Sequence, residues 1–228
     1  MGWLGDVCSA IGSAISSVCS SLGGALGGVA ALASALIPGF GLAEIVLVVQ
    51  AVCTIVSTVA ELLGLKKDEK MEEIGMAAEN AELKPEDFDS TEEYIEYLRE
   101  EVKKLDKEEV ENLSNEDRVK YQAVGAAITI KGIEEKYGMS MPAEFWNTAK
   151  DMELKGEEVK TYMDTFKKNG IEDMGDMAAY LKGEETKSDA HAVSDSMMEA
   201  LGEMYPDLSR EELDDKLTEM ENKVKEIE

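Results

Sequence analysis

Few side chains in this sequence have the type and spacing that catalysis needs. His191 is the only histidine, and it lies in the polar stretch 189–192 without a nucleophile or a metal-ligand pattern beside it. A histidine without such partners is expected at the surface. Carboxylate pairs such as Glu157 and Glu158 are expected by chance in a chain with 49 acidic residues, so they do not indicate glycosidase-type chemistry. No enzyme activity is therefore predicted.

The residues that commonly hold metals and cofactors are also poorly arranged. Cys8, Cys19 and Cys53 form no CxxC or Cys/His pattern, so a buried free thiol is the expectation for each. Residues 169–173 have some of the residues of a calcium-binding loop but not its register. The sequence contains neither a phosphate-binding loop nor a dinucleotide-binding glycine pattern. We expect no cofactor and no metal.

The charge of the chain is very uneven. Its formal net charge is −26, yet the first 65 residues hold only three acidic side chains and no lysine or arginine. An acidic surface of this size repels phosphates, so nucleic-acid binding is excluded. The acidic part is compatible with a solvated surface and with a basic protein partner.

The N-terminal segment has a long apolar run, because residues 7–43 contain no charged side chain. Within residues 4–37, small residues recur four apart and therefore share one helix face, where a second helix can approach closely. These small residues are Gly12, Ser16, Ser20, Gly24 and Gly28, with Gly23 and Gly27 in an adjacent row. We predict that residues 4–37 form the first arm of a helical hairpin.

A turn and a bulkier second arm follow. Pro38 disfavours helical geometry at the residue before it, and Gly39 and Gly41 allow the chain to reverse. Residues 42–65 are strongly apolar, and about 23 residues at about 1.5 Å per residue extend roughly 35 Å, which is enough to cross a hydrocarbon core. The second arm is therefore the stronger candidate for a membrane span.

Three polar residues and a group of lysines mark the second arm. Glu44 falls in its first turn, where the helix dipole favours an anion, Gln50 lies near its middle, and Glu61 falls in its last turn. Lysines at 66, 67 and 70 follow at once. A cationic flank of this kind is typical of the cytoplasmic side of a span, so we expect the acidic part on that side.

Three interpretations of the hairpin stay open. It inserts into a membrane, it is buried against other subunits of a soluble assembly, or it lies on a membrane surface as an amphipathic helix. The third fits least well, because the polar face holds serine and glycine rather than lysine and arginine. Close packing of small residues is useful in both of the others.

The apolar hairpin of residues 1–65, with its glycine rows and its turn at residues 38–41, resembles the hydrophobic hairpins of bacterial pore-forming toxins and of membrane-targeting secretion-system effectors. The resemblance implies a non-enzymatic effector or toxin that forms pores or disrupts membranes. Its partner would be the lipid bilayer, and it would act at a membrane after secretion or delivery to a target cell. The alternative is a structural or adaptor component of a phage or secretion particle. A protein partner or a homo-oligomer through the hairpin is expected in both cases.

The rest of the chain reads as one helix after another, without the alternating pattern of strands. Helix starts are predicted at the serine and acidic clusters of residues 89–93 and 114–117, and a last helix is predicted over residues 210–227. Residues 123–130 form the one strongly apolar stretch, which predicts a buried core helix. Thirteen methionines indicate core filling or a plastic binding surface.

The predicted fold class is all-α, with an N-terminal hydrophobic helical hairpin followed by an acidic multi-helix domain. The predicted divisions are a hairpin over residues 1–65, an acidic helical domain over 66–182, and a linker with C-terminal helices over 183–228. The candidate functional residues are those of the hairpin, because they are the ones with an unusual pattern.

Overall fold

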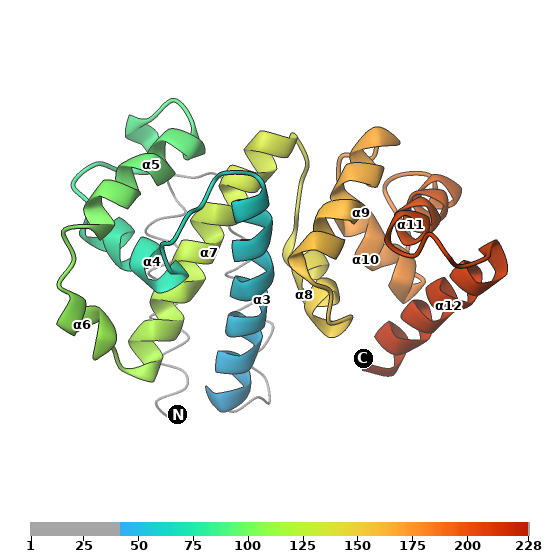
Figure 1. Ribbon diagram of the computed structural model, residues 1–228, viewed down its shortest axis with the longest axis horizontal. Helices are drawn as coiled ribbons and strands as arrows, with labels where there is room; N and C mark the ends of the chain where they lie inside the picture. Colours follow the sequence, from blue (N-terminus) through green and yellow to red (C-terminus); the bar gives the residue numbers. More distant parts are fainter. Residues whose placement is uncertain (1–41, 228) are drawn as a thin grey trace. The chain divides into compact units, whose positions relative to one another are not determined.

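The structure is a computed structural model that describes residues 42–227 (Figure 1). Its regular structure over these residues consists of ten α-helices and one short 3₁₀ helix, with no strand among them. The all-α prediction is confirmed for this part of the chain. The first arm and the turn at residues 38–41 lie outside the described residues, so the hairpin itself stays a prediction.

The described chain forms two compact units, the first ending at Lys136 and the second beginning at Tyr137. The first unit contains α3 (Leu42–Leu62), α4 (Met71–Asn80), the 3₁₀ helix Pro85–Asp87, α5 (Thr91–Val102), α6 (Lys107–Glu111) and nearly all of α7 (Asn115–Tyr137). The second unit contains α8 (Ala143–Asp151), α9 (Gly156–Lys168), α10 (Gly175–Lys182), α11 (Ala190–Met204) and α12 (Arg210–Ile227). The predicted domain boundaries after residues 65 and 182 stay predictions.

Helix starts in both units follow local sequence signals. Ser90 is the N-cap of α5, and its hydroxyl accepts a hydrogen bond from the backbone N–H of Glu93 at 3.2 Å. Ser209 does the same for Glu212 at the start of α12, at 3.3 Å. Each side chain satisfies a backbone donor that has no partner within the helix. The predicted helix start at residues 89–93 and the predicted last helix are therefore confirmed.

The end of α3 is set by a glycine turn. Gly64 has a φ of 72°, a left-handed conformation that strains any residue with a side chain. This turn lets the N–H of Leu65 donate to the carbonyl oxygen of Ala60 at 2.8 Å, which closes the last turn of the helix. Leu65 then points inward and is only 2% exposed. The second arm thus stops as a helix three residues before its predicted end at residue 65.

The core of the first unit is built around α7, whose residues 123–130 are all buried, as predicted for this stretch. Helix α4 crosses α7 with almost no space between the two backbones. A Cβ atom on Gly75 would lie 2.0 Å from the carbonyl oxygen of Tyr121, and one on Gly125 would lie 2.0 Å from the carbonyl oxygen of Met71. Only glycine allows this approach, so these two positions set the geometry of the crossing.

The core of the second unit is filled by aromatic rings and methionines. The rings of Phe145 and Trp146 in α8 meet edge to face with their centroids 5.0 Å apart, and the indole N–H of Trp146 donates to the carbonyl oxygen of Met141 at 3.1 Å. Met163 and Phe166 of α9 are fully buried. Large side chains rather than close backbones therefore occupy the centre of this unit.

The polar segment between α10 and α11 is fastened to α10. The Asp176 side chain is 2% exposed, and its carboxylate accepts hydrogen bonds from the backbone N–H groups of Lys187 at 2.6 Å and Ser188 at 3.0 Å. The ammonium of Lys187 also pairs with Asp173 at 2.5 Å. One buried carboxylate thus fixes a segment whose sequence has no apolar period.

Candidate functional site

The described part of the predicted second arm is α3, and one face of it belongs to the core of the first unit. Val52, Ile55, Val56 and Val59 are buried on this face. The thiol of Cys53 donates to the carbonyl oxygen of Gln122 in α7 at 3.5 Å, and the two helices lie side by side in Figure 1. The apolar face of the second arm is therefore covered by the chain's own helices.

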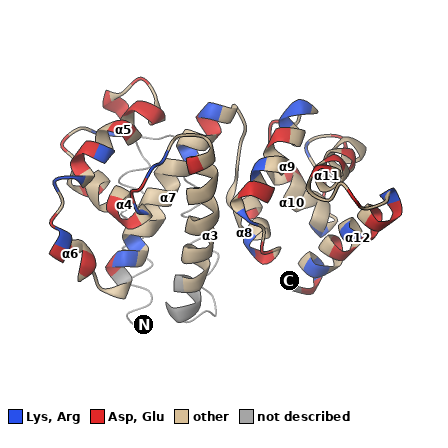
Figure 2. Ribbon diagram, in the orientation of Figure 1, with Lys and Arg blue, Asp and Glu red and all other residues tan. Residues whose placement is uncertain are grey.

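The opposite face of α3 carries a row of polar side chains, here called the polar stripe, which consists of Gln50, Thr54, Ser57, Thr58 and Glu61. Gln50, Thr54 and Glu61 are exposed, and the other two are half-buried. Because residues three and four apart share a helix face, this stretch is amphipathic although its sequence looks uniformly apolar. Figure 2 shows the middle of α3 as a helix without charged side chains.

The threonines of the polar stripe satisfy their own hydroxyl groups. The hydroxyl of Thr54 donates to the carbonyl oxygen of Gln50 at 2.8 Å, and that of Thr58 donates to the carbonyl oxygen of Thr54 at 3.1 Å. Such bonds within the helix allow a hydroxyl to leave water without losing its donor bond. The polar stripe is therefore suited to face either water or another helix.

The predicted charged residues around α3 are only partly free. Glu44 lies in the first turn of α3, as predicted, and Glu61 lies in its last turn. Glu61 accepts a bond from the ammonium of Lys66 at 2.8 Å, and Lys66 also donates to the carbonyl oxygen of Lys67 at 3.1 Å. Lys66 is 8% exposed, so it is tied into the fold, whereas Lys67 and Lys70 are exposed.

The other predicted packing residues lie outside the described residues. They are Gly12, Ser16, Ser20, Gly23, Gly24, Gly27, Gly28, Pro38, Gly39 and Gly41. Among the helices of residues 42–227, none combines the length and the apolarity that a bilayer crossing requires.

A buried charge lies close to α3, and the sequence did not reveal it. Glu72 of α4 is 7% exposed, and its carboxylate pairs with Arg118 at 3.0 Å and accepts from the side-chain amide of Gln122 at 3.3 Å. Burial, with a smaller contribution from the negative charge of Glu72, raises the pKa of the Cys53 thiol from 9.0 to about 12. A glutamate in the first turn of a helix ordinarily reads as solvated, so only its contact with Arg118 identifies it.

An open pocket of about 430 Å³ lies between the polar stripe and the start of α4. It is lined by Gln50, Cys53, Thr54, Ser57, Lys66, Asp68, Glu69, Lys70, Met71, Glu72 and Gln122. A thiol nucleophile must be deprotonated to react, and the raised pKa keeps the Cys53 thiol protonated at neutral pH. The pocket thus has a buried, protonated thiol at its wall.

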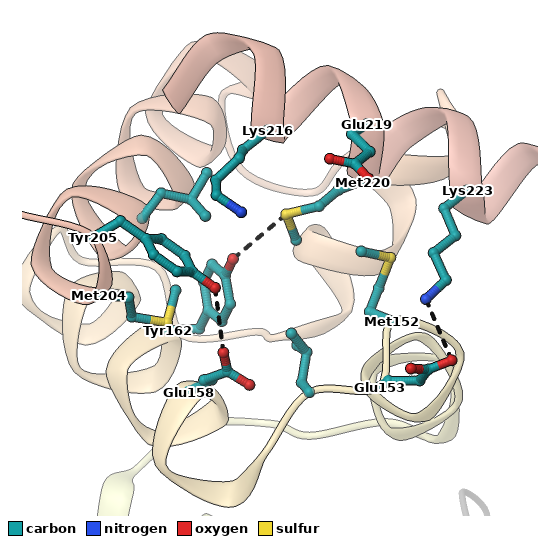
Figure 3. Close-up of a pocket in the computed structure, with 12 residues that line it drawn as sticks. Met152, Glu153, Glu158, Tyr162, Met204, Tyr205, Lys216, Glu219, Met220 and Lys223 are labelled. Carbon is teal, nitrogen blue, oxygen red and sulfur yellow. Dashed lines mark hydrogen bonds and ion pairs between the residues drawn. The ribbon is translucent and has the colours of Figure 1, made fainter. Parts of the chain in front are cut away.

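The second unit has a smaller pocket of about 270 Å³ between the α8–α9 loop, α9, the end of α11, and α12 (Figure 3). Its apolar lining consists of Met152, Leu154, Tyr162, Leu201, Met204, Tyr205 and Met220. Its charged lining consists of Glu153, Glu158, Lys216, Glu219 and Lys223. The sequence is rich in methionine but carries no signal for which of these residues share a pocket.

The single histidine and the described cysteine have the settings expected from the sequence. His191 is exposed in the first turn of α11, where its backbone N–H bonds to the carboxylate of the N-cap residue Asp189 at 3.0 Å. Cys53 is a free, buried cysteine. No group of three or more histidine, cysteine, aspartate or glutamate side chains within the described part of the chain is arranged to hold a metal ion.

Comparison of the chain with protein-family models, with curated proteins and with solved structures finds no match. Function is therefore inferred from the residues themselves.

Proposed function

We propose that this protein is a non-enzymatic, membrane-inserting protein whose N-terminal hairpin enters a bilayer, and whose first unit holds the second arm when no membrane is present. The amphipathic pattern of α3 carries this proposal. Its apolar face, with Val52, Val56 and Val59, is shielded from water by α7 and its neighbours, while the polar stripe faces outward. The uncharged residues 7–43 lead directly into this helix.

Moving the apolar face of α3 from the core to lipid exchanges one apolar environment for another. The hydrophobic driving force that keeps α3 docked is therefore largely retained in a bilayer, whereas release into water would forfeit it. The polar stripe has the opposite requirement, because a polar group in hydrocarbon needs water or a partner. Several copies of the hairpin that insert with the polar stripes of their α3 helices facing one another, around water, satisfy both requirements and form a pore.

The polar ties that hold α3 in the first unit are few. Arg99 donates to the carbonyl oxygen of Leu65, just after the helix, whereas the pair between Lys66 and Glu61 joins α3 only to the segment that directly follows it. Within the helix, the thiol of Cys53 bonds to Gln122. Release of α3 therefore breaks mainly apolar packing, which lipid can replace.

The test is dye release from liposomes of zwitterionic phosphatidylcholine by the full chain, combined with a disulfide that locks α3 in the first unit. Gln122→Cys places a second thiol on the α7 residue whose backbone carbonyl accepts from Cys53, and Cys8 and Cys19 are changed to Ser so that only this pair can form a disulfide. Titration of free thiols shows whether the disulfide has formed. We expect the oxidised protein to be inactive and the same sample to release dye after reduction. Gln122→Ser is the matched control, because it removes the side-chain amide without offering a second sulfur.

Two results would count against the proposal in different ways. An intact purified protein that binds liposomes but never releases dye would overturn pore formation. Equal dye release by the oxidised and reduced forms would overturn the docking step, because insertion would then not require α3 to leave the first unit.

A second candidate function is a structural or adaptor role in a particle, with the hairpin buried against partner subunits. The observation that favours it is the exposure of two leucines of α3, with Leu47 in the first half of the helix 65% exposed and Leu62 at its end 48% exposed. Exposed leucines beside an apolar helix are typical of a surface that another protein covers. Purification from its source as a stoichiometric particle without detergent would favour this role over membrane insertion.

A further inference from the structure

The pocket of the second unit gathers methionines at its wall, whereas several other methionines of that unit fill the core. Met163, Met177 and Met197 are fully buried, whereas Met152 and Met204 are half-buried at the pocket wall. We propose that this pocket binds one aromatic side chain of a basic helical partner.

The size of the pocket favours one side chain as occupant. Its volume of about 270 Å³ lies just below the range of about 300–1,000 Å³ that is typical of small-molecule and cofactor sites. A single large side chain presented by a helix needs less space than a cofactor, and central aromatic anchors of this kind dominate the affinity of many interfaces.

The chemistry of the walls favours an aromatic group. Met152, Met204 and Met220 bring thioether groups from three different elements, and thioether sulfur makes favourable contacts with aromatic rings. Tyr162 and Tyr205 add two rings, with the Tyr162 hydroxyl directed at the Met220 sulfur at 3.6 Å (Figure 3). Flexible methionines also let the pocket adapt to the shape of the incoming ring.

The charges around the pocket favour a basic partner. Lys223 is neutralised by Glu153 at 3.6 Å, and the Lys216 ammonium lies 4.3 Å from the ring centroid of Tyr205. Glu219 on α12 is exposed, and no residue of the described chain forms an ion pair with it. Glu158, on the opposite wall, accepts bonds from the backbone N–H of Lys155 at 2.7 Å and from the Tyr205 hydroxyl at 3.5 Å, and no lysine or arginine side chain of the described chain pairs with it (Figure 3). Two carboxylates without an ion-pair partner thus flank the opening, beside the ammonium of Lys216.

The charge of the whole chain points the same way. At a net charge of −26, an acidic segment is repelled from this pocket, whereas a basic helix is attracted by the two carboxylates beside it. The carboxylates beside the opening also make the pocket selective for basic partners, because they repel an acidic helix that carries the same aromatic side chain.

The experiment uses the full chain and a fluorescein-labelled helical peptide of alanine, glutamine and lysine with one central tryptophan. Anisotropy titration should show binding that weakens about tenfold or more when the tryptophan is replaced by alanine. Met204→Glu should weaken binding similarly although it adds attraction for lysine. Met198→Glu, on the same helix and equally half-buried but outside the pocket, is the matched control and should not weaken binding.

Methionine methyl signals in NMR spectra give a second measurement that does not depend on affinity. The methyl groups of Met152, Met204 and Met220 should shift on addition of the peptide, whereas that of the buried Met163 should stay in place. Equal affinity for the peptides with and without tryptophan would overturn the proposal. Chemical-shift changes spread over all the methionine methyl groups would overturn it as well. The chain's own tryptophan at position 3 is a possible competing occupant of the pocket. If Trp3→Ala shifts the same three methyl signals without peptide, the pocket holds this tryptophan and the proposal is overturned.

Discussion

The first unit brings its helices together at glycine, whereas the second unit separates them with large side chains. Gly75 in α4 and Gly125 in α7 let the backbones of these two helices touch where the helices cross. In α8 and α9, Trp146, Met163 and Phe166 fill the space between elements. Backbone contact fixes a single register, while methionine and aromatic packing adapts to small changes. The first unit should therefore be the more brittle of the two, and the second the more tolerant.

The largest expected difference is in thiol reactivity. With Cys8 and Cys19 changed to Ser, Cys53 in the folded chain should react with a disulfide reagent at pH 8 at least about tenfold more slowly than in urea, because burial raises the pKa of the thiol and keeps the reagent away from it. A cysteine placed at the half-buried pocket position by Met204→Cys in a Cys53→Ala background should react much faster. Equal reaction rates at the two positions would contradict the burial of Cys53 between α3 and α7.

The same thiol makes a prediction about pH and stability. Because the folded pKa of Cys53 lies above its unfolded value of 9.0, the folded state holds the proton more tightly. The resulting stability is fully present below pH 9 and is lost as pH rises toward 12. Urea midpoints measured at pH 8 and pH 10.5 should therefore fall further for the parent chain than for Cys53→Ala.

The next largest effect is expected from Gly75→Ala. The new Cβ would lie 2.0 Å from the Tyr121 carbonyl oxygen, so the two helices must separate, at a cost of about 3 kcal/mol or more. Hydrogen exchange should accelerate in α4 and α7 and stay unchanged in α9 and α11. Gly202→Ala in α11 is the matched control: its Cβ would meet only Leu213 at 3.8 Å, so about 0.5–1 kcal/mol of stabilisation is expected. Similar losses for both variants would remove the contrast between the units.

A smaller loss, about 2 kcal/mol, is expected from Asp176→Ala in the second unit. The substitution removes a buried carboxylate and leaves the N–H groups of Lys187 and Ser188 without their acceptor. Trypsin should then cut after Lys187 earlier than in the parent chain. Glu185→Ala, an exposed neighbour in the same segment, should stay within about 0.5 kcal/mol of the parent.

The smallest effect is expected at the serine N-caps, which occur in both units. Ser90→Ala in the first unit and Ser209→Ala in the second should each cost about 1 kcal/mol, because each removes the acceptor of one N-terminal helix N–H. Urea denaturation should show nearly equal losses. A clearly larger loss at either site would mean that the cap also supports packing beyond its own helix.

The elements of the described chain were largely predictable because their signals are local. The last helix was predicted over residues 210–227 and has these bounds, since Ser209 caps its start. The buried stretch 123–130 could be recognised from its apolar run alone. Signals of this kind depend on neighbours in the sequence, so one chain is enough to find them.

The features that require distant partners could not be predicted. The burial of Glu72 depends on Arg118, and the close approach at Gly75 depends on Gly125, each pair being far apart in the sequence. The polar stripe of α3 was hidden because threonine and serine read as small residues within an apolar run, and only the burial of the opposite face reveals it. The methionine pocket likewise requires four elements to be placed together.

The position of α3 in the first unit has a consequence for synthesis of the chain. α3 ends at Leu62, but its neighbour α7 is complete only at Tyr137. The roughly 75 residues between them take roughly 4–15 s to translate at about 5–20 residues per second. During that time the nascent chain displays an apolar helix that its own fold cannot yet cover, so a chaperone or a targeting factor could bind it first. Whether the second arm folds against α7 or is bound by such a factor would then depend on the rate of translation relative to the rate of binding.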